Sequence, residues 1–543
     1  MSNTRRLPIF KSPAVRLLAA ATVVVAALGP GVTASSASPV WLLEKSKKDC
    51  LGKVAGIDLQ AATIPRLARA LAGGQLTSVQ LTKAYLERIR AYDPKLNSVR
   101  HFNPRALKQA RKADRILNRG TDEGLPPLYG VPILLKDNVN TNDMPTTAGS
   151  IALKGSVPKH DAFIVKKLER AGAIILGKLN LSEFAGWVSL GMPPGYSSLA
   201  GQVHNAYSYT WTPSGSSAGS GVAASMAFSA ATIGTETSGS ILSPSDANSI
   251  VGIKPTTGLV SRTDILPLSP SFDTAGPMVR NVTDAAVVLG AITGTDKADG
   301  RTADADSEMP KGGDYTKFLK ANSLKDARIG FSEEDRDGLP EARRQLFNRA
   351  LEDLRKQGAE LDPTDTLNFS KWAGLAEIAF IPNEFKASLN TYLETETSAK
   401  KLPVRTLSDI IEYNKRHPNK IKYGQNLLEA SDATPGRSEL EPASQAAIQT
   451  ARAAIDGTLL SNDLDALVAP GPAYANVSAS AGYPTVMVPG GYAKGSNVPL
   501  GISFLGSAWD EPQLISFAFD YEQASERRVP PTHFNADLRK SGC

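Results

Sequence analysis

The sequence has 543 residues, of which 41% are hydrophobic and 21% are charged. This composition is typical of a globular protein and excludes a disordered, collagen-like or coiled-coil chain. A chain of this length can bury a large core without disulfides or metal ions. The five scattered histidines and two cysteines, with no CxxC pair, form no metal-binding pattern, so we expect no metal site.

The first 37 residues have the features of an export signal. Residues 1–34 contain no acidic side chain and four basic ones, Arg5, Arg6, Lys11 and Arg16. The apolar run 17–28 is too short to span a bilayer comfortably, and small residues follow that would allow cleavage after about residue 34 or 37. We therefore expect a secreted or cell-envelope protein without a stable membrane anchor. An uncleaved helix is the alternative, and Arg5-Arg6 leaves the twin-arginine route open.

Cleavage of this segment would lower the net charge of the chain. The formal charge of +6 would fall by four to +2, so nothing favours nucleic acid as a partner. Cys50 and Cys543 would meet an oxidising environment after export. The sequence leaves open whether they form a disulfide or stay unpaired, and it does not determine the oligomeric state.

Residues 38–543 are predicted to form an α/β domain. A capping box from Thr77 to Gln80 begins a helix that Pro94 is predicted to end. Buried strands are predicted at 131–135, which ends at Lys136, and at 173–176, with a helix at 161–171 between them. Short apolar strands that alternate with helices are typical of layered α/β folds.

The stretch 212–245 is rich in serine and glycine but also contains ordered elements. An Ala-rich helical segment at 222–228 and a strand at 230–233 make a flexible linker an unsuitable interpretation. We interpret the stretch as two loops of one site. The region 311–462 is more polar and more helical than the rest. Helices are predicted at 343–357, 408–415 and 510–524, and strands at 466–470, 485–489 and 501–505.

Lys136 ends an apolar strand, where its ammonium group would be partly desolvated. Desolvation disfavours the charged form and lowers the pKa of a lysine. A neutral lysine amine can act as a general base near neutral pH. For a lysine considered alone, a surface position at a strand end is the ordinary alternative.

Two Ser/Gly segments, SGSSAGS at 214–220 and GTETSGSI at 234–241, suit nucleophilic chemistry. Glycines let backbone amides approach a ligand closely, and successive amides can form an oxyanion hole. A serine beside them can attack a carbonyl if a base takes its proton. A simple turn or a phosphate-binding loop is the alternative, although the GxxxxGK[ST] pattern is absent.

Together, these segments resemble the amidase signature family. GVPILLKDN, PSGSSAGSGVAAS and GTETSGSILSPSDANSIVGIKPTTGLVSR are similar to its signature, and FDTAGPM follows. Lys136 precedes Ser216 by 80 residues, and Ser240 follows Ser216 by 24. Matching segments run from about residue 75 to residue 528. The resemblance implies a single amidase domain with a large mixed β-sheet covered by helices on both sides.

The resemblance also implies the roles of the site residues. Ser240 would be the nucleophile, Ser216 a proton relay after a cis peptide bond, and Lys136 the base, with no cofactor. Ser217 would support the relay. The oxyanion hole would be formed by the backbone N–H groups of Thr237, Ser238, Gly239 and Ser240. Asp137 and Glu236 would have structural roles.

Ser238 and Leu242 depart from the family's common Gly-Gly-Ser-Ile-Arg segment. Ser238 still provides a backbone N–H, but its side chain would narrow the oxyanion hole. Leu242 lacks the positive charge that the family's common arginine has at this position. Members that resemble peptide amidases also lack this arginine, and 406–431 resembles them too. Such enzymes deamidate the C-terminal carboxamide of peptides. Small aliphatic, aryl and fatty acid amides are alternative substrates, and the region 311–462 is expected to shape the pocket.

Three functions remain to be compared at this point. The first is an exported amidase that hydrolyses the carboxamide C–N bond of a small-molecule or peptide substrate through a Ser240 acyl-enzyme. The second is a catalytically silent exported binding homologue, against which the retained Lys136, Ser216 and Ser240 argue. The third is a transamidase subunit, against which the export signal and the near-neutral mature charge argue.

Overall fold

A mixed β-sheet organises the fold. The computed structural model describes residues 51–119, 124–364, 375–397, 402, 404–436 and 442–539. Among these residues, eleven strands form one sheet in the order β12 (Glu360–Pro363), β11 (Arg328–Phe331), β13 (Ala466–Pro470), β15 (Pro499–Leu505), β14 (Thr485–Tyr492), β9 (Val251–Lys254), β10 (Thr274–Val279), β8 (Ala231–Glu236), β4 (Pro132–Lys136), β5 (Ile174–Leu179) and β3 (Val99–Phe102). The neighbours β12–β11, β11–β13, β8–β4 and β4–β5 are parallel, and the others are antiparallel. Two small pairs, β1 (Lys53–Val54) with β2 (Ile57–Asp58) and β6 (Tyr196–Ser197) with β7 (Gly201–Gln202), lie outside it.

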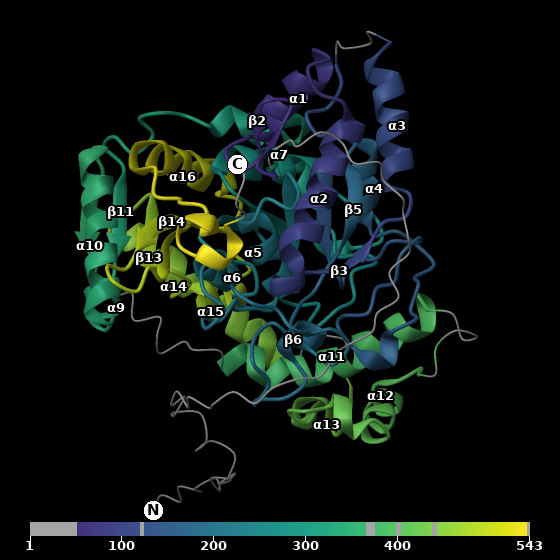
Figure 1. The fold of residues 1–543 in the computed structure, drawn as a ribbon. Helices are drawn as coiled ribbons and strands as arrows, with labels where there is room; N and C mark the ends of the chain where they lie inside the picture. The colour runs from purple at the N-terminus through teal and green to yellow at the C-terminus, as the bar shows by residue number, and fades with distance from the viewer. Residues whose placement is uncertain are drawn as a thin grey trace, which may run out of the picture. The chain divides into compact units, whose positions relative to one another are not determined.

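Helices cover both faces of this sheet (Figure 1). The helices of the described chain are α1 (Ile64–Ala72), α2 (Ser78–Leu96), α3 (Ala106–Leu117), α4 (Phe163–Arg170), α5 (Ala218–Ser225), α6 (Leu242–Ala247), α7 (Val282–Ile292), α8 (Ala305–Glu308), α9 (Glu333–Asp337), α10 (Glu341–Lys356), α11 (Leu375–Thr395), α12 (Leu407–Lys415), α13 (Asn426–Asp432), α14 (Pro442–Ser461), α15 (Ala475–Ala481) and α16 (Glu511–Ser525). Helices α4, α7, α16 and α10 form a row on one face of the sheet. Helices α5 and α6 pack on the opposite face.

The central strands are buried along their whole length because neither face meets water. Every residue of β4, β8 and β10 is buried. Strands covered on both faces have continuous hydrophobic runs instead of alternating ones. This pattern confirms the predicted α/β fold class.

Most elements begin and end close to the predicted residues, but two differ. Helix α2 has the predicted capping box at Thr77, yet it continues past Pro94 to Leu96. A proline in the last turn removes only one helical hydrogen bond, and Asn97, with φ at 56°, ends the helix instead. Helix α5 starts directly after Ser217, which is earlier than the helical segment predicted at 222–228.

A second hydrophobic cluster lies under the helices α11, α12 and α13, which are side by side in Figure 1. It joins Phe385 and Leu389 of α11 to Phe184, Leu266 and Leu268 from loops of the main domain. Because these loops border the sheet edge described below, α11 is held beside the candidate site.

Two points raised by the sequence lie outside the described residues. They are the export signal over 1–37 and the question whether Cys50 and Cys543 form a disulfide. Within the part of the chain that the structure describes, no helix is long and apolar enough to cross a membrane.

Candidate active site

The ends of two parallel strands bring the lysine segment and the second Ser/Gly segment together. Strand β4 ends at Lys136 and β8 ends at Glu236, with Leu135 opposite Ile233. Parallel strands have their carboxyl ends at the same edge of a sheet, where α/β proteins place their sites. Thr235 is therefore beside Lys136, and the turn 237–240 follows at the same edge.

Lys136 is fully buried and has three oxygen atoms around its amine. Its Nζ lies 2.7 Å from Ser216 Oγ, 2.9 Å from Thr235 Oγ1 and 3.1 Å from the Thr235 carbonyl oxygen. Burial lowers the pKa of Lys136 to about 7, although Asp273 and Glu236 act to raise it. The predicted lowering of this pKa is therefore present, and a neutral amine is available near pH 7.

The loop before α5 places Ser216 and Ser217 against both strands. The Gly215–Ser216 peptide bond is cis, as the resemblance implied. The Ser217 hydroxyl donates to the Thr235 carbonyl oxygen at 3.0 Å, and the Ser217 N–H donates to the Ser240 carbonyl oxygen at 3.2 Å. Ser217 thus connects the Ser216 loop to β8 and to the turn that contains Ser240.

The turn after β8 presents Ser240. Gly239 has φ at 73°, a conformation that favours glycine. The carboxylate of Glu236 accepts hydrogen bonds from the N–H groups of Ile241 at 2.6 Å and Leu242 at 3.0 Å. Ser240 itself is 8% exposed, and its hydroxyl makes no hydrogen bond within the described part of the chain. Glu236 therefore connects the end of β8 to the residues that follow Ser240.

The backbone N–H groups of the turn 237–240 differ in whether they already have an acceptor. Those of Thr237, Ser238 and Ser240 donate no hydrogen bond to any described residue. The N–H of Gly239, in contrast, interacts with the buried Glu236 carboxylate and, with Lys254 and other backbone groups, opposes the rise in the pKa of Glu236 that burial causes. The Ser238 hydroxyl donates to Asn476 Oδ1 at 2.9 Å.

Three polar residues of the site were missed in the sequence. Thr235 contacts the Lys136 amine through two oxygen atoms, and Asn138 Nδ2 donates to Thr235 Oγ1 at 2.9 Å. Asp273 accepts a hydrogen bond of 2.5 Å from Thr237 Oγ1. Their residue types indicate no particular chemistry. The available signal was position, since Asn138 and Thr235 lie within the GVPILLKDN and GTET segments.

A cavity of about 570 Å³ adjoins this group of residues. Asn138, Thr235 and Thr237 line it, and so do Tyr392 and Glu396. Apolar side chains between Ile265 and Leu268 form a further wall. The region 311–462 therefore contributes directly to the cavity through α11 and the residue that follows it.

Comparison with known proteins agrees with this geometry. The model of the Amidase family matches residues 80–478, which is most of the chain. The chain belongs to the amidase signature family. It is accordingly an amidase, a hydrolase that acts on carbon–nitrogen bonds.

Amidases also resemble the chain over nearly their whole length. A probable amidase of Arabidopsis thaliana is 42% identical over 87% of this chain and 92% of its own. The structure of an amidase family protein from Bacillus anthracis has a TM-score of 0.81 and 39% identity, and covers 87% of this chain and 92% of its own. The native peptide amidase from Stenotrophomonas maltophilia has a TM-score of 0.79 and 41% identity, and covers 87% and 98%. The mixed sheet covered by helices is thus the fold of this family.

Proposed function

We propose that this amidase uses Ser240 as nucleophile, Ser216 as proton relay and Lys136 as base. The observation that carries the proposal is the arrangement of three oxygen atoms around the buried Lys136 Nζ. A neutral amine has two N–H bonds and one lone pair. The two oxygens of Thr235 accept the N–H bonds, so the lone pair is left for the Ser216 hydroxyl at 2.7 Å.

The reaction then proceeds by formation and hydrolysis of an acyl-enzyme, with proton transfers through Ser216. The Ser216 proton moves to Lys136 as Ser216 accepts the proton of Ser240, and Ser240 Oγ attacks the amide carbonyl. The tetrahedral intermediate collapses when the C–N bond breaks, and the proton held by Lys136 returns through Ser216 to the leaving nitrogen. Water then attacks the acyl-enzyme along the same proton path, which regenerates Ser240 and releases the carboxylic acid.

The turn 237–240 would stabilise the oxyanion of the intermediate. The N–H groups of Thr237, Ser238 and Ser240 are unused inside the described structure and lie beside the nucleophile. Donors that are fixed before the reaction stabilise developing charge without reorganisation, and one of them typically contributes about 10²–10³-fold in kcat. Gly239, which was predicted as a further donor, would share its N–H with Glu236.

For the substrate, we propose the C-terminal carboxamide of peptides, with ammonia as the released product. The 41% identity to a peptide amidase over nearly all of that protein supports this choice. Leu242, in the place of the family's common arginine, is buried with Ala475 and Met487 and leaves no charge there. The adjoining cavity, at about 570 Å³, lies in the size range of small-ligand sites.

Hydrolysis of an amidated peptide by the purified protein tests the proposal. We expect release of ammonia and the free peptide acid, measured by an ammonia assay and by mass spectrometry, and covalent labelling of Ser240 by a serine-directed fluorophosphonate. Ser240→Ala is the control and should lose both signals. Absence of an adduct on Ser240 in an active preparation would overturn the nucleophile. Activity only on glutamine together with a copurifying subunit would indicate a transamidase.

A further inference from the structure

The cavity beside the candidate active site has an acidic wall. Asp264 and Glu396 line it, and their side chains are 13% and 14% exposed. Their cationic neighbours are Lys166, 3.7 Å from Asp264, and His160, 3.1 Å from Glu396. These two side chains are 42% and 59% exposed and do not line the cavity. The cations are therefore on the solvent side, whereas the carboxylates face the cavity.

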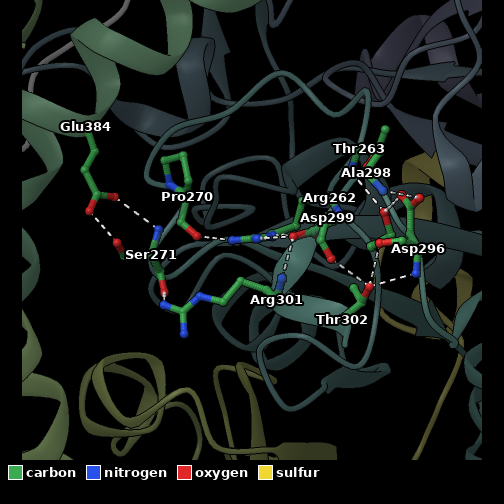
Figure 2. A network of polar contacts seen from close by, with 11 residues as sticks. Arg262, Thr263, Pro270, Ser271, Asp296, Ala298, Asp299, Arg301, Thr302 and Glu384 are labelled. Atoms are coloured by element: carbon green, nitrogen blue, oxygen red, sulfur yellow. Dashed lines mark hydrogen bonds and ion pairs between the residues drawn. The ribbon is translucent and has the colours of Figure 1, made fainter. Parts of the chain in front are cut away.

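The other charged side chains of this cavity already have partners. Arg262 forms a two-point ion pair with Asp299, and Figure 2 shows this pair within a wider network of polar contacts. Asp273 accepts one side-chain and two backbone hydrogen bonds. Among the described lining residues, Asp264 and Glu396 are thus the carboxylates whose cationic neighbours lie outside the cavity lining.

Burial and mutual proximity disfavour ionisation of this carboxylate pair. Burial, and after it the proximity of Glu396, raises the pKa of Asp264 to about 6, although Lys166 and His160 act to lower it. Two like charges in a partly desolvated place disfavour ionisation unless a cation approaches them. A positively charged ligand group would supply that cation.

A buried polar group lines the same cavity as this pair and contacts Thr235, which is a partner of the Lys136 amine. Asn138 is 5% exposed and lines the cavity, and its Oδ1 has no hydrogen-bond partner within the described structure. The Leu266 N–H donates to the Asn138 carbonyl oxygen, and two residues later the Asn140 N–H donates to that of Asp264. Two residues span at most about 7 Å. The backbone of Asp264 is therefore connected to Thr235 through the short segment 138–140, because Asn138 Nδ2 donates to Thr235 Oγ1.

We infer that this wall is a subsite for the ammonium group of an amide substrate, with Asn138 Oδ1 accepting an N–H of the same molecule. The inference deepens the proposed function and rests on it, because it specifies short peptide amides with a positive charge near the amidated end. The apolar residues 265–268 would contact the part of the substrate between its charge and its carboxamide.

A divalent cation is the competing occupant of this place. The ligand atoms of His160, Asp264 and Glu396 lie within 4.8 Å of one another, and histidine with carboxylates can bind such metals. An ammonium group is favoured because the imidazole does not line the cavity while both carboxylates do. The carboxylates also share one cavity with Thr235, next to which the carboxamide would react.

Matched substrates that differ only in charge test the inference. A dipeptide amide and a tripeptide amide would each be compared with their N-acetylated forms, which lack the ammonium group. We expect kcat/KM to be about tenfold or more higher for the charged form of at least one length, the range of a charge-assisted hydrogen bond. Asp264→Asn and Glu396→Gln should remove this preference, because they lower kcat/KM for the charged substrates more than for the acetylated ones.

Controls separate this inference from the proposed function. Asp463→Asn changes a side chain that is 91% exposed and should keep the preference. Thermal unfolding would verify that the two cavity variants fold. Equal rates for charged and acetylated substrates, or a preference that survives both cavity variants, would overturn the inference. So would a preference that EDTA abolishes and Zn²⁺ restores, because the cluster would then be a metal site.

Binding measurements keep the inference testable if turnover fails. Hydrolysis of neither substrate would contradict the proposed function alone. Titration calorimetry of the Ser240→Ala variant with the same peptide amides would then measure charge recognition directly. We expect tighter binding of the ammonium form, and equal or absent binding of the two forms would contradict the subsite.

Discussion

The burial of Lys136 links activity to pH at the scale of the residue. The base must be neutral, and its pKa is lowered to about 7 because burial disfavours the ammonium form. Activity should therefore be low below pH 7 and should rise as pH increases through this value. Lys136→Ala should reduce kcat/KM by about 10²–10⁴-fold, the usual contribution of a general base. Initial rates across pH measure both effects, and a comparable loss in His204→Ala would contradict them.

Thr235 is a positioning residue, and its effect should be visible in the pH profile. Its Oγ1 accepts a hydrogen bond from Lys136 at 2.9 Å, which stabilises the charged amine. Thr235→Val removes this acceptor, so the pKa of Lys136 should fall and the rise in activity should move to lower pH. We also expect kcat to fall about tenfold or more, since the lone pair loses its orientation. Thr235→Ser should restore both values, whereas an unchanged pH profile would argue against this role.

At the scale of elements, the small residues of α5 allow the Ser216 loop to reach the sheet edge. A Cβ on Gly219 would lie 2.3 Å from the Asn180 carbonyl oxygen and 2.6 Å from that of Ser98. Gly219→Ala should therefore lower the free energy of unfolding by about 1–3 kcal/mol, because neither backbone atom can move freely. Activity should fall with it, since α5 starts directly after Ser217.

A second glycine provides the matched control for this prediction. Gly457 lies inside α14, and a Cβ there would meet nothing within 4 Å. Gly457→Ala should raise the free energy of unfolding by about 0.5–1 kcal/mol, because alanine favours a helix. Urea denaturation measures both variants. Equal effects of the two substitutions would show that close packing at α5 does not matter.

At the scale of the whole molecule, the sequence predicts export, which stays a proposal. The basic residues 5–16 and the apolar run 17–28 precede small residues that suit cleavage after about residue 34 or 37. Expression of the full sequence in an export-competent host should yield a mature protein that begins at residue 35 or 38, identified by N-terminal sequencing. An intact N-terminus on the active protein would contradict the signal.

Much of the site follows from local segments, whereas its surroundings follow from non-local packing. Lys136, Ser216 and Ser240 each lie in a motif of adjacent residues, so the sequence alone could single them out. Asp264 and Glu396 are 132 positions apart (264 to 396) and belong to no motif. They meet because α11 packs on the loop 262–268, and this contact depends on the second hydrophobic cluster.

The sequence by itself determined the family, the α/β fold class and the identity of the proposed catalytic side chains. These conclusions depend on residue types at fixed spacings within short segments of the chain. Such patterns can be read without knowing which distant segments pack together. Only the tertiary structure decided that β4 and β8 end side by side, with Thr235 against the Lys136 amine. Strand register and burial arise from contacts between distant segments. The pKa of Lys136 near 7 and the acidic wall of the cavity are therefore properties of the folded chain.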